Sequence, residues 1–294
     1  MIGPPPSTTP SATLAKESSS MRSLPALLLA ALVLVDCQSL SGGSARSAPA
    51  ADERLPRILA SGALRVAVSP DRPPLILKNR SGATVGFDVD IVSALATAMG
   101  LELHLVEVPF ADLLWSVETG RADLAISGLT MTPERNARVA FAGPYFVSGM
   151  SVLARSRAIT DVENPAALDH AERRYAAVTG STSAKFIGDV LPHAQLVPVG
   201  DYDTGIQMVI DGKADALFAD HLVCSVAVWR HPDAGLSTLA TPFTVEPFGI
   251  AVPPDAPLLL NLVQNYLATL EHTGLLAGYK AKWLADGRWL AEMP

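Results

Sequence analysis

The sequence predicts an α/β fold with a largely parallel sheet. From Gly62 onward, short β-rich segments alternate with amphipathic helical segments. Residues 64–68 are expected to form a strand, and residues 86–99 a helix that ends at Gly100, which suits a left-handed C-cap. Strands that alternate with helices of this length are typical of an α/β fold.

A second run of the same alternation, residues 175–218, predicts a second lobe. We expect residues 60–152 and 250–294 to form lobe 1 and residues 155–246 to form lobe 2, joined by a hinge of two strands. The predicted links lie near residues 152–154 and 248–250. A cleft between two α/β lobes is a favoured place for a small ligand.

Composition excludes several functional classes. The chain has 294 residues, of which 49% are hydrophobic, and a formal charge of −7. This charge and the scarcity of basic clusters argue against a nucleic-acid partner. The two cysteines, Cys37 and Cys224, and the absence of His/Cys zinc spacing suggest neither a disulfide scaffold nor a zinc site. No cofactor is expected.

The first 50 residues read as an extension followed by an export signal and a linker. Residues 1–20 are rich in Pro, Ser and Thr and are expected to be disordered. Met21 and Arg22 then precede the apolar segment 24–35, which is too short to span a bilayer as a helix but fits a signal-peptide core. We interpret Met21 as the true start.

Two export outcomes remain open. Residues 34–37 resemble a lipoprotein cleavage site, which would make Cys37 the lipidated N-terminus, although Asp36 departs from the pattern. Residues 48–50 (Ala-Pro-Ala) offer a site for ordinary cleavage. We favour lipidation of Cys37. In either case the mature protein is exported, and it meets a membrane only through this possible anchor.

The segment from Ser127 to Arg135 is the most informative motif. It follows an apolar strand, and Thr132 and Pro133 are typical of a helix start. A backbone N–H group, the Thr130 hydroxyl and the Arg135 guanidinium would converge on one carboxylate, which arginine can bind through two parallel hydrogen bonds. The alternative is a plain capped helix with a surface arginine.

The motif is one of six blocks that resemble, in order, the extracytoplasmic solute-binding proteins of polar amino-acid ABC transporters. They cover nearly the whole mature chain and comprise Gly86-Phe87-Asp88-Val89-Asp90, Ser127 to Arg135, Phe141-Ala142-Gly143-Pro144-Tyr145, Gly180-Ser181-Thr182-Ser183, Gly212-Lys213-Ala214-Asp215-Ala216 and Glu246-Pro247-Phe248-Gly249-Ile250-Ala251. The resemblance implies a periplasmic-binding-protein-like fold that closes around its ligand, without a metal or cofactor.

The same resemblance implies roles for individual residues. Arg135, Thr130 and Gly128 would hold the α-carboxylate of an amino-acid-like ligand. Ser181 and Thr182 would add donors from the other lobe.

At the opposite end of the ligand, Asp220 would accept hydrogen bonds from its α-ammonium group. Phe110 would supply an apolar wall. Trp115 is a second candidate for the wall, but its place within a helix favours a core position.

The chain departs from the family after its first strand. Arg72 occupies a region that usually carries an aromatic residue, and Ser69 stands where several relatives have an aspartate. Losing an acid and gaining a base predicts a neutral polar or acidic ligand. A simply solvated Arg72 is the alternative.

The resemblance also leaves other functions open. Cyclohexadienyl dehydratases share these motifs but place a glutamate where this chain has Ala184, which cannot act as a general acid. A sensor that contacts a receptor is a further alternative. We expect a monomeric binding protein, not an enzyme, whose closed form is recognised by ABC permease subunits.

Overall fold

A computed structural model describes residues 53–285 and 287–293. The extension 1–20, the apolar segment 24–35, Cys37 and the alternative cleavage site at 48–50 lie outside the described residues. The described chain folds into two five-stranded sheets with helices on their faces, and a small three-stranded sheet. The predicted two-lobed α/β fold is therefore confirmed.

Lobe 1 is built on a sheet with strand order β5-β1-β6-β13-β7. β1 runs parallel to β5 and β6, whereas β13 is antiparallel to both β6 and β7. β6 is apolar and buried along its whole length because both of its faces are covered, whereas β5, at the edge of the sheet, has only exposed and half-buried residues. The bounds of the five strands are Glu102–Glu107 (β5), Ala63–Val68 (β1), Leu124–Thr130 (β6), Glu246–Val252 (β13) and Ala140–Ser148 (β7).

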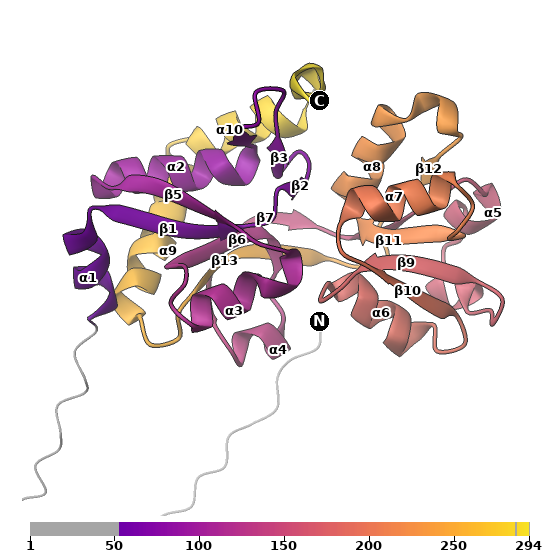
Figure 1. Ribbon diagram of the computed structural model, residues 1–294, viewed down its shortest axis with the longest axis horizontal. Helices are drawn as coiled ribbons and strands as arrows, with labels where there is room; N and C mark the ends of the chain where they lie inside the picture. Colours follow the sequence, from indigo (N-terminus) through magenta and orange to yellow (C-terminus); the bar gives the residue numbers. More distant parts are fainter. Residues whose placement is uncertain (1–52, 286, 294) are drawn as a thin grey trace, which may run out of the picture. The chain divides into compact units, whose positions relative to one another are not determined.

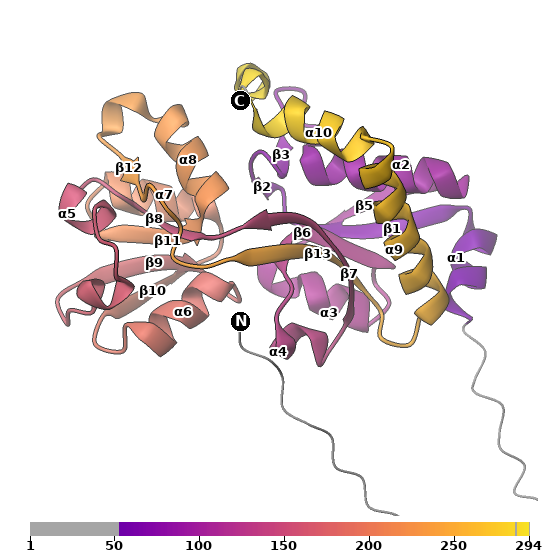
Figure 2. The ribbon, with the colours of Figure 1, turned by 180° about the vertical axis from the view of Figure 1, so that it is seen from behind.

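Helices α2 and α3 cover opposite faces of this sheet (Figure 1). α10 packs beside α2, where Trp283 Nε1 donates to Asp90 at 2.7 Å (Figure 2). The expected C-cap Gly100 ends α2 with φ +69°. The helices of lobe 1 are α1 (Arg54–Ser61), α2 (Phe87–Met99), η1 (Phe110–Asp112), α3 (Leu113–Glu118), α4 (Pro133–Asn136), α9 (Pro257–His272), α10 (Leu275–Leu284) and η4 (Arg288–Glu292).

Lobe 2 is built on a sheet with strand order β10-β9-β11-β8-β12. β9 runs parallel to β10 and β11, and β8 is antiparallel to β11 and β12. α6 and α7 cover opposite faces (Figure 1). The bounds are Met150–Ala154 (β8), Arg174–Val178 (β9), Gln195–Val199 (β10), Ala216–Asp220 (β11), Ser237–Thr238 (β12), Arg157–Thr160 (α5), Pro165–Leu168 (η2), Thr182–Val190 (α6), Tyr202–Ile210 (α7), His221–Arg230 (α8) and Pro232–Ala234 (η3).

The two lobes are joined by a pair of antiparallel segments, seen side by side in Figure 2. Ser148 of β7 pairs with Glu246 of β13, and Gly149 then leads directly into β8. A Cβ atom at Gly149 would overlap the carbonyl oxygen of Thr244, so only glycine permits this close approach. The links thus lie a few residues before the predicted ones, because β8 belongs wholly to lobe 2 and β13 wholly to lobe 1.

The small sheet contains β2 (Asp71–Arg72), β3 (Ile76–Lys78) and β4 (Thr84–Val85). Its residues Ile76 and Leu77 are buried in the core of lobe 1. β2 pairs with β3, and this pairing positions Arg72 directly after β1.

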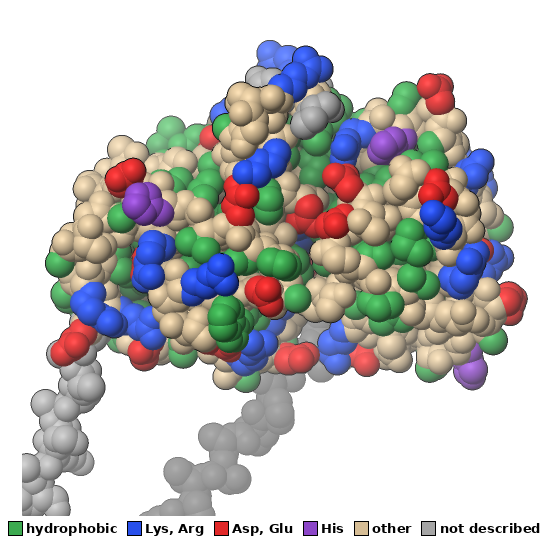
Figure 3. All heavy atoms as spheres, viewed as in Figure 1, with side chains coloured by type: hydrophobic (Ala, Val, Ile, Leu, Met, Phe, Trp, Pro, Cys, Tyr) green, Lys and Arg blue, Asp and Glu red, His purple; other side chains and the backbone are tan. Residues whose placement is uncertain are grey.

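On the face seen in Figure 3, basic and acidic side chains of the described residues are interspersed instead of forming one extended area of either sign. Among residues 53–285 and 287–293, no helix is both long and apolar enough to cross a membrane.

Candidate ligand-binding site

Polar side chains from both lobes meet at the carboxyl ends of parallel strands. In lobe 1, Ser69 follows β1, and Arg135 follows β6. In lobe 2, Ser181 follows β9, and Asp220 is the last residue of β11. Loops at the carboxyl ends of parallel strands are the common place for a ligand in α/β proteins, because the strand ends bring distant residues to one edge.

Arg135 lies at the junction of the lobes. α4 presents it, and the Thr132 hydroxyl caps this short helix by accepting from Arg135 N at 3.2 Å. Its guanidinium donates to the carbonyl groups of Thr130, at 2.9 Å, and of Gly180 in lobe 2, at 3.1 Å. The residue is 9% exposed. The alternative of a surface arginine is thereby wrong.

The charge of Arg135 has no direct counterion in the described chain. Its guanidinium donates to the two carbonyl groups, and no described carboxylate forms an ion pair with it. Burial, followed by the nearby charge of Arg72, lowers the pKa of Arg135 to about 10, so it stays cationic at neutral pH. A guanidinium has five N–H donors, so donors remain for an incoming anion.

A buried glutamate joins two of the predicted donors. Thr130 Oγ1 of lobe 1 donates to Glu246 Oε2 at 2.7 Å, and Thr182 Oγ1 of lobe 2 donates to the same oxygen at 3.1 Å. Glu246 is 5% exposed. Its role was missed in the sequence, although an acid at the start of the otherwise apolar strand β13 was a visible signal.

The Ser181 side chain caps the helix that follows it. Its hydroxyl accepts from Ala184 N at 3.1 Å, so it is the N-cap of α6. The Ser69 hydroxyl is likewise engaged, because it donates to Asp71 at 2.7 Å, and Asp71 accepts from Tyr202 N of lobe 2 at 3.2 Å. Of these two predicted site residues, Ser181 therefore stabilises the start of α6. Ser69 orients Asp71, which contacts the other lobe.

Arg72 is buried and forms an ion pair with Asp220. It is 2% exposed, which excludes the alternative of a solvated side chain. Nη1 donates to the carbonyl groups of Ser127 at 2.6 Å and Gly128 at 3.0 Å, and Nη2 donates to the Asp220 carboxylate of lobe 2. The structure thus brings Arg72 and Asp220 together across the lobes.

Three aromatic rings surround the Arg72 guanidinium. Its Cζ atom lies 4.9 Å from the ring centroid of Phe110, 5.2 Å from that of Tyr202 and 5.8 Å from that of Phe248. Phe110 also approaches Arg135, at 5.7 Å. The predicted wall residue Phe110 thus contacts both arginines. Trp115 is 48% exposed, so its expected place in the core is wrong.

The backbone N–H of Gly128, which was predicted to bind the ligand's carboxylate, is already hydrogen-bonded within lobe 1. It donates to Asp88 Oδ2 at 2.9 Å and lies 3.2 Å from the hydroxyl oxygen of Tyr145. This N–H group is therefore not available to a ligand carboxylate. The carbonyl group of Gly128 instead positions Arg72.

Replacing Gly128 by alanine is expected to lower the free energy of unfolding by about 2 kcal/mol. The residue has φ +55°, which L side chains rarely adopt, and an added Cβ would lie 2.6 Å from Leu75 Cδ1. Chemical denaturation would measure the loss. Gly212→Ala is the matched control, because Gly212 has φ +72° with no atom near the added Cβ. Equal losses in both variants would mean that packing at Gly128 does not matter.

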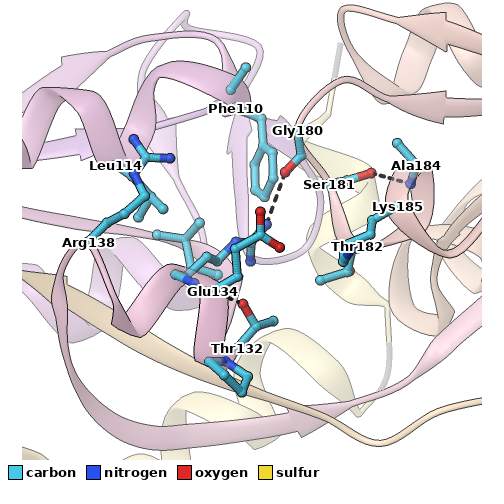
Figure 4. Close-up of a pocket in the computed structure, with 14 residues that line it drawn as sticks. Phe110, Leu114, Thr132, Glu134, Arg138, Gly180, Ser181, Thr182, Ala184 and Lys185 are labelled. Atoms are coloured by element: carbon cyan, nitrogen blue, oxygen red, sulfur yellow. Dashed lines mark hydrogen bonds between the residues drawn. The ribbon is translucent and has the colours of Figure 1, made fainter. Parts of the chain in front are cut away.

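A cavity of about 570 Å³ opens beside Arg135. Figure 4 shows Thr182 and Lys185 of α6 on one side of it and Leu114 and Arg138 of lobe 1 on the other. Basic side chains outnumber acidic ones in its lining, since Arg135, Arg138 and Lys185 face one carboxylate, that of Glu134. Asp220 and Arg72 do not line it. Among the described residues no His, Cys, Asp or Glu cluster is suited to a metal.

Comparisons with known proteins agree with this architecture. Cyclohexadienyl dehydratase of Pseudomonas aeruginosa is 29% identical over 249 residues, which cover 83% of this chain and 90% of that protein. ABC transporter arginine-binding protein 1 of Escherichia coli K12 is 29% identical over 225 residues, which cover 74% and 88%. The structure of an ancestral arginine-binding protein bound to arginine matches with a TM-score of 0.72 and 26% identity, covering 76% and 99%.

A family model described as bacterial extracellular solute-binding proteins, family 3, matches residues 64–286, the greater part of the chain. The match spans both lobes, the hinge and the cleft. The chain belongs to this family of extracellular solute-binding proteins.

Proposed function

We propose that the protein binds a small, amino-acid-like carboxylate in the cleft and delivers it to an ABC importer. The observation that carries the proposal is Arg135, a buried guanidinium at the junction of the lobes with no carboxylate partner in the described chain. A carboxylate accepts well-aligned, charge-assisted hydrogen bonds from such a group. Family membership and the arginine-binding relative support binding for transport.

Closure of the lobes is the proposed mechanism. Arg135 of lobe 1 reaches Gly180 of lobe 2, and Thr182 of lobe 2 reaches Glu246 of lobe 1. A ligand that contacts Arg135 and the first turn of α6 together favours the closed arrangement by its extra contacts there. The closed monomer is then recognised by the permease subunits.

Binding without turnover fits the cavity better than dehydration does. Cyclohexadienyl dehydration needs a carboxyl group that protonates the leaving hydroxyl. At the position where the resemblance to those enzymes expects a glutamate, the cavity is lined by Ala184. Glu246 lies close by, but it accepts hydrogen bonds from two threonines. The dehydratase relative is nevertheless the reason to test turnover directly.

The test is thermal unfolding of the mature protein against a panel of amino acids and related carboxylates, with prephenate and arogenate included. A ligand at about 100 times its dissociation constant is expected to stabilise the fold by about 2.7 kcal/mol, seen as a higher Tm. The matched control for each acid is its amide, which lacks the anionic charge. Stabilisation by amide and acid alike, or consumption of prephenate or arogenate, would contradict the proposal.

Export is part of the same proposal, because the family acts outside the cell. We propose that the mature protein is anchored through a lipidated Cys37. Mass spectrometry of its N-terminal peptide distinguishes a lipidated Cys37 from a free N-terminus beyond residue 50, and the latter result would replace the anchor by a freely secreted form.

A further inference from the structure

The cleft contains a complete binding site for a cation, and a side chain of the protein fills it. Phe110, Tyr202 and Phe248 present their rings to one guanidinium at 4.9–5.8 Å, within the range of a cation–π contact. Asp220, which is 5% exposed, supplies the counterion. The carbonyl groups of Ser127 and Gly128 accept two further hydrogen bonds. The occupant is Arg72.

The two arginines of the cleft differ in their charge balance. Arg72 has Asp220 as an internal counterion, whereas Arg135 forms an ion pair with none of the described residues. A buried charge without a partner is costly, so an incoming molecule that neutralises Arg135 is favoured. A second cation near Asp220 would have to displace Arg72 or remain unpaired, and both are unfavourable.

The open cavity lies beside Arg135 and not beside Asp220. Its lining includes Arg135, Arg138 and Lys185, with Glu134 as the acidic member. Arg138 is paired with Glu118, and Lys185 with Asp189, so these two basic side chains add less than full charges. The space left to a ligand therefore adjoins the anion half of the cleft, while the cation half is closed.

We propose that Arg72 is a built-in occupant of the cation site, and that the ligand is a carboxylate without an ammonium group. A 2-oxo or 2-hydroxy acid with an amino-acid-like side chain has the required chemistry. This inference rests on the proposed function, since it names the ligand class of the same cleft. It also assigns the choice between ligands with and without an ammonium group to Arg72, because this side chain occupies the position beside Asp220 that a ligand cation would need.

The first experiment compares matched acids on the unmodified mature protein by calorimetry and thermal unfolding. Each set contains the 2-amino, 2-oxo and 2-hydroxy acid with one side chain. The 2-oxo or 2-hydroxy acid is expected to bind at least about tenfold more tightly than the amino acid. An amino acid that binds as tightly or more tightly overturns the inference but leaves carboxylate binding intact. Failure of all acids to bind contradicts the proposed function itself.

The second experiment tests the cation site without any need to know the ligand. Arg72→Ala leaves Asp220 and the three rings facing an unfilled site. Methylguanidinium chloride at millimolar concentration is expected to raise the Tm of Arg72→Ala. It should raise neither that of the unmodified protein nor that of Arg72→Ala/Asp220→Asn, with sodium chloride as the salt control.

Arg72→Ala is also expected to gain affinity for amino acids relative to their 2-oxo counterparts. A folded Arg72→Ala variant that does not respond to methylguanidinium, or that responds no more than the double variant, overturns the assignment. If Arg72→Ala does not fold, the comparison of matched acids on the unmodified protein decides alone.

Discussion

Replacing Arg135 by alanine is expected to weaken binding of the carboxylate ligand by roughly 100- to 1000-fold. The carbonyl group of Thr130, in the same lobe, positions the guanidinium before a ligand arrives, so less ordering is needed on binding. Loss of the guanidinium leaves the ligand's carboxylate in the cleft without the cation that offsets the cost of burying its charge. Isothermal titration of the ligand found in the panel measures the loss.

Two further variants separate the charge of Arg135 from its shape. Arg135→Lys keeps the charge but loses the planar fork, so it should bind with an affinity between those of Arg135→Ala and the unmodified protein. Arg155→Ala removes an exposed arginine of lobe 2 and should leave the affinity for the ligand unchanged. Wild-type affinity in a folded Arg135→Ala variant would remove the residue from the site and the main support for the proposed function.

Local patterns were sufficient to predict the alternation of strands and helices. Gly100 and the cap at Thr132 marked helix ends correctly, because each acts through neighbouring backbone groups. The segment that begins at Ser127 was expected to follow the strand, but β6 runs on to Thr130. Gly128 hid the continuation, since a glycine with positive φ inside a strand looks like a turn in sequence.

The candidate site was only partly accessible to the same reasoning. The resemblance to the solute-binding proteins assigned Arg135, Thr182 and Asp220 to one cleft, and the ends of the parallel strands are a reasonable place for such residues. The partners of these side chains depend on contacts between lobes, such as that of Arg72 with Asp220 across 148 positions of sequence. No local periodicity encodes such a contact. Glu246 was missed for this reason, as it bonds Thr130 and Thr182 at separations of 116 and 64.

The stability of the protein is expected to fall as the pH rises from about 4 to about 8, and Asp88 is the cause. This carboxyl group is fully buried behind the cleft in lobe 1. Oδ2 accepts from Gly128 N at 2.9 Å and from the Tyr145 hydroxyl at 3.0 Å, whereas Oδ1 has no partner among the described residues. Burial raises the pKa of Asp88 to about 7, against the lowering effects of these two hydrogen bonds and of the Arg72 charge.

The direction follows from linkage between protonation and folding. The pKa is higher in the folded than in the unfolded chain, so the folded state binds the proton more tightly. The stabilisation is complete below the unfolded pKa near 4 and is lost as the pH rises through 7. A shift from 3.8 to about 7 corresponds to about 4 kcal/mol of the free energy of unfolding.

Asp88→Asn should remove this component of the pH dependence. The amide stays neutral, its oxygen can accept from Gly128 and Tyr145, and its NH₂ group takes the place of Oδ1. The free energy of unfolding is measured with urea at pH 4, 6 and 8. Relative to the unmodified protein, that of the variant should increase as the pH rises, with the largest difference at pH 8. Asp112→Asn, at an exposed position, is the control and should follow the unmodified protein throughout. Parallel curves for Asp88→Asn and the unmodified protein would mean that Asp88 does not titrate between these limits, and that its burial is offset by its two donors.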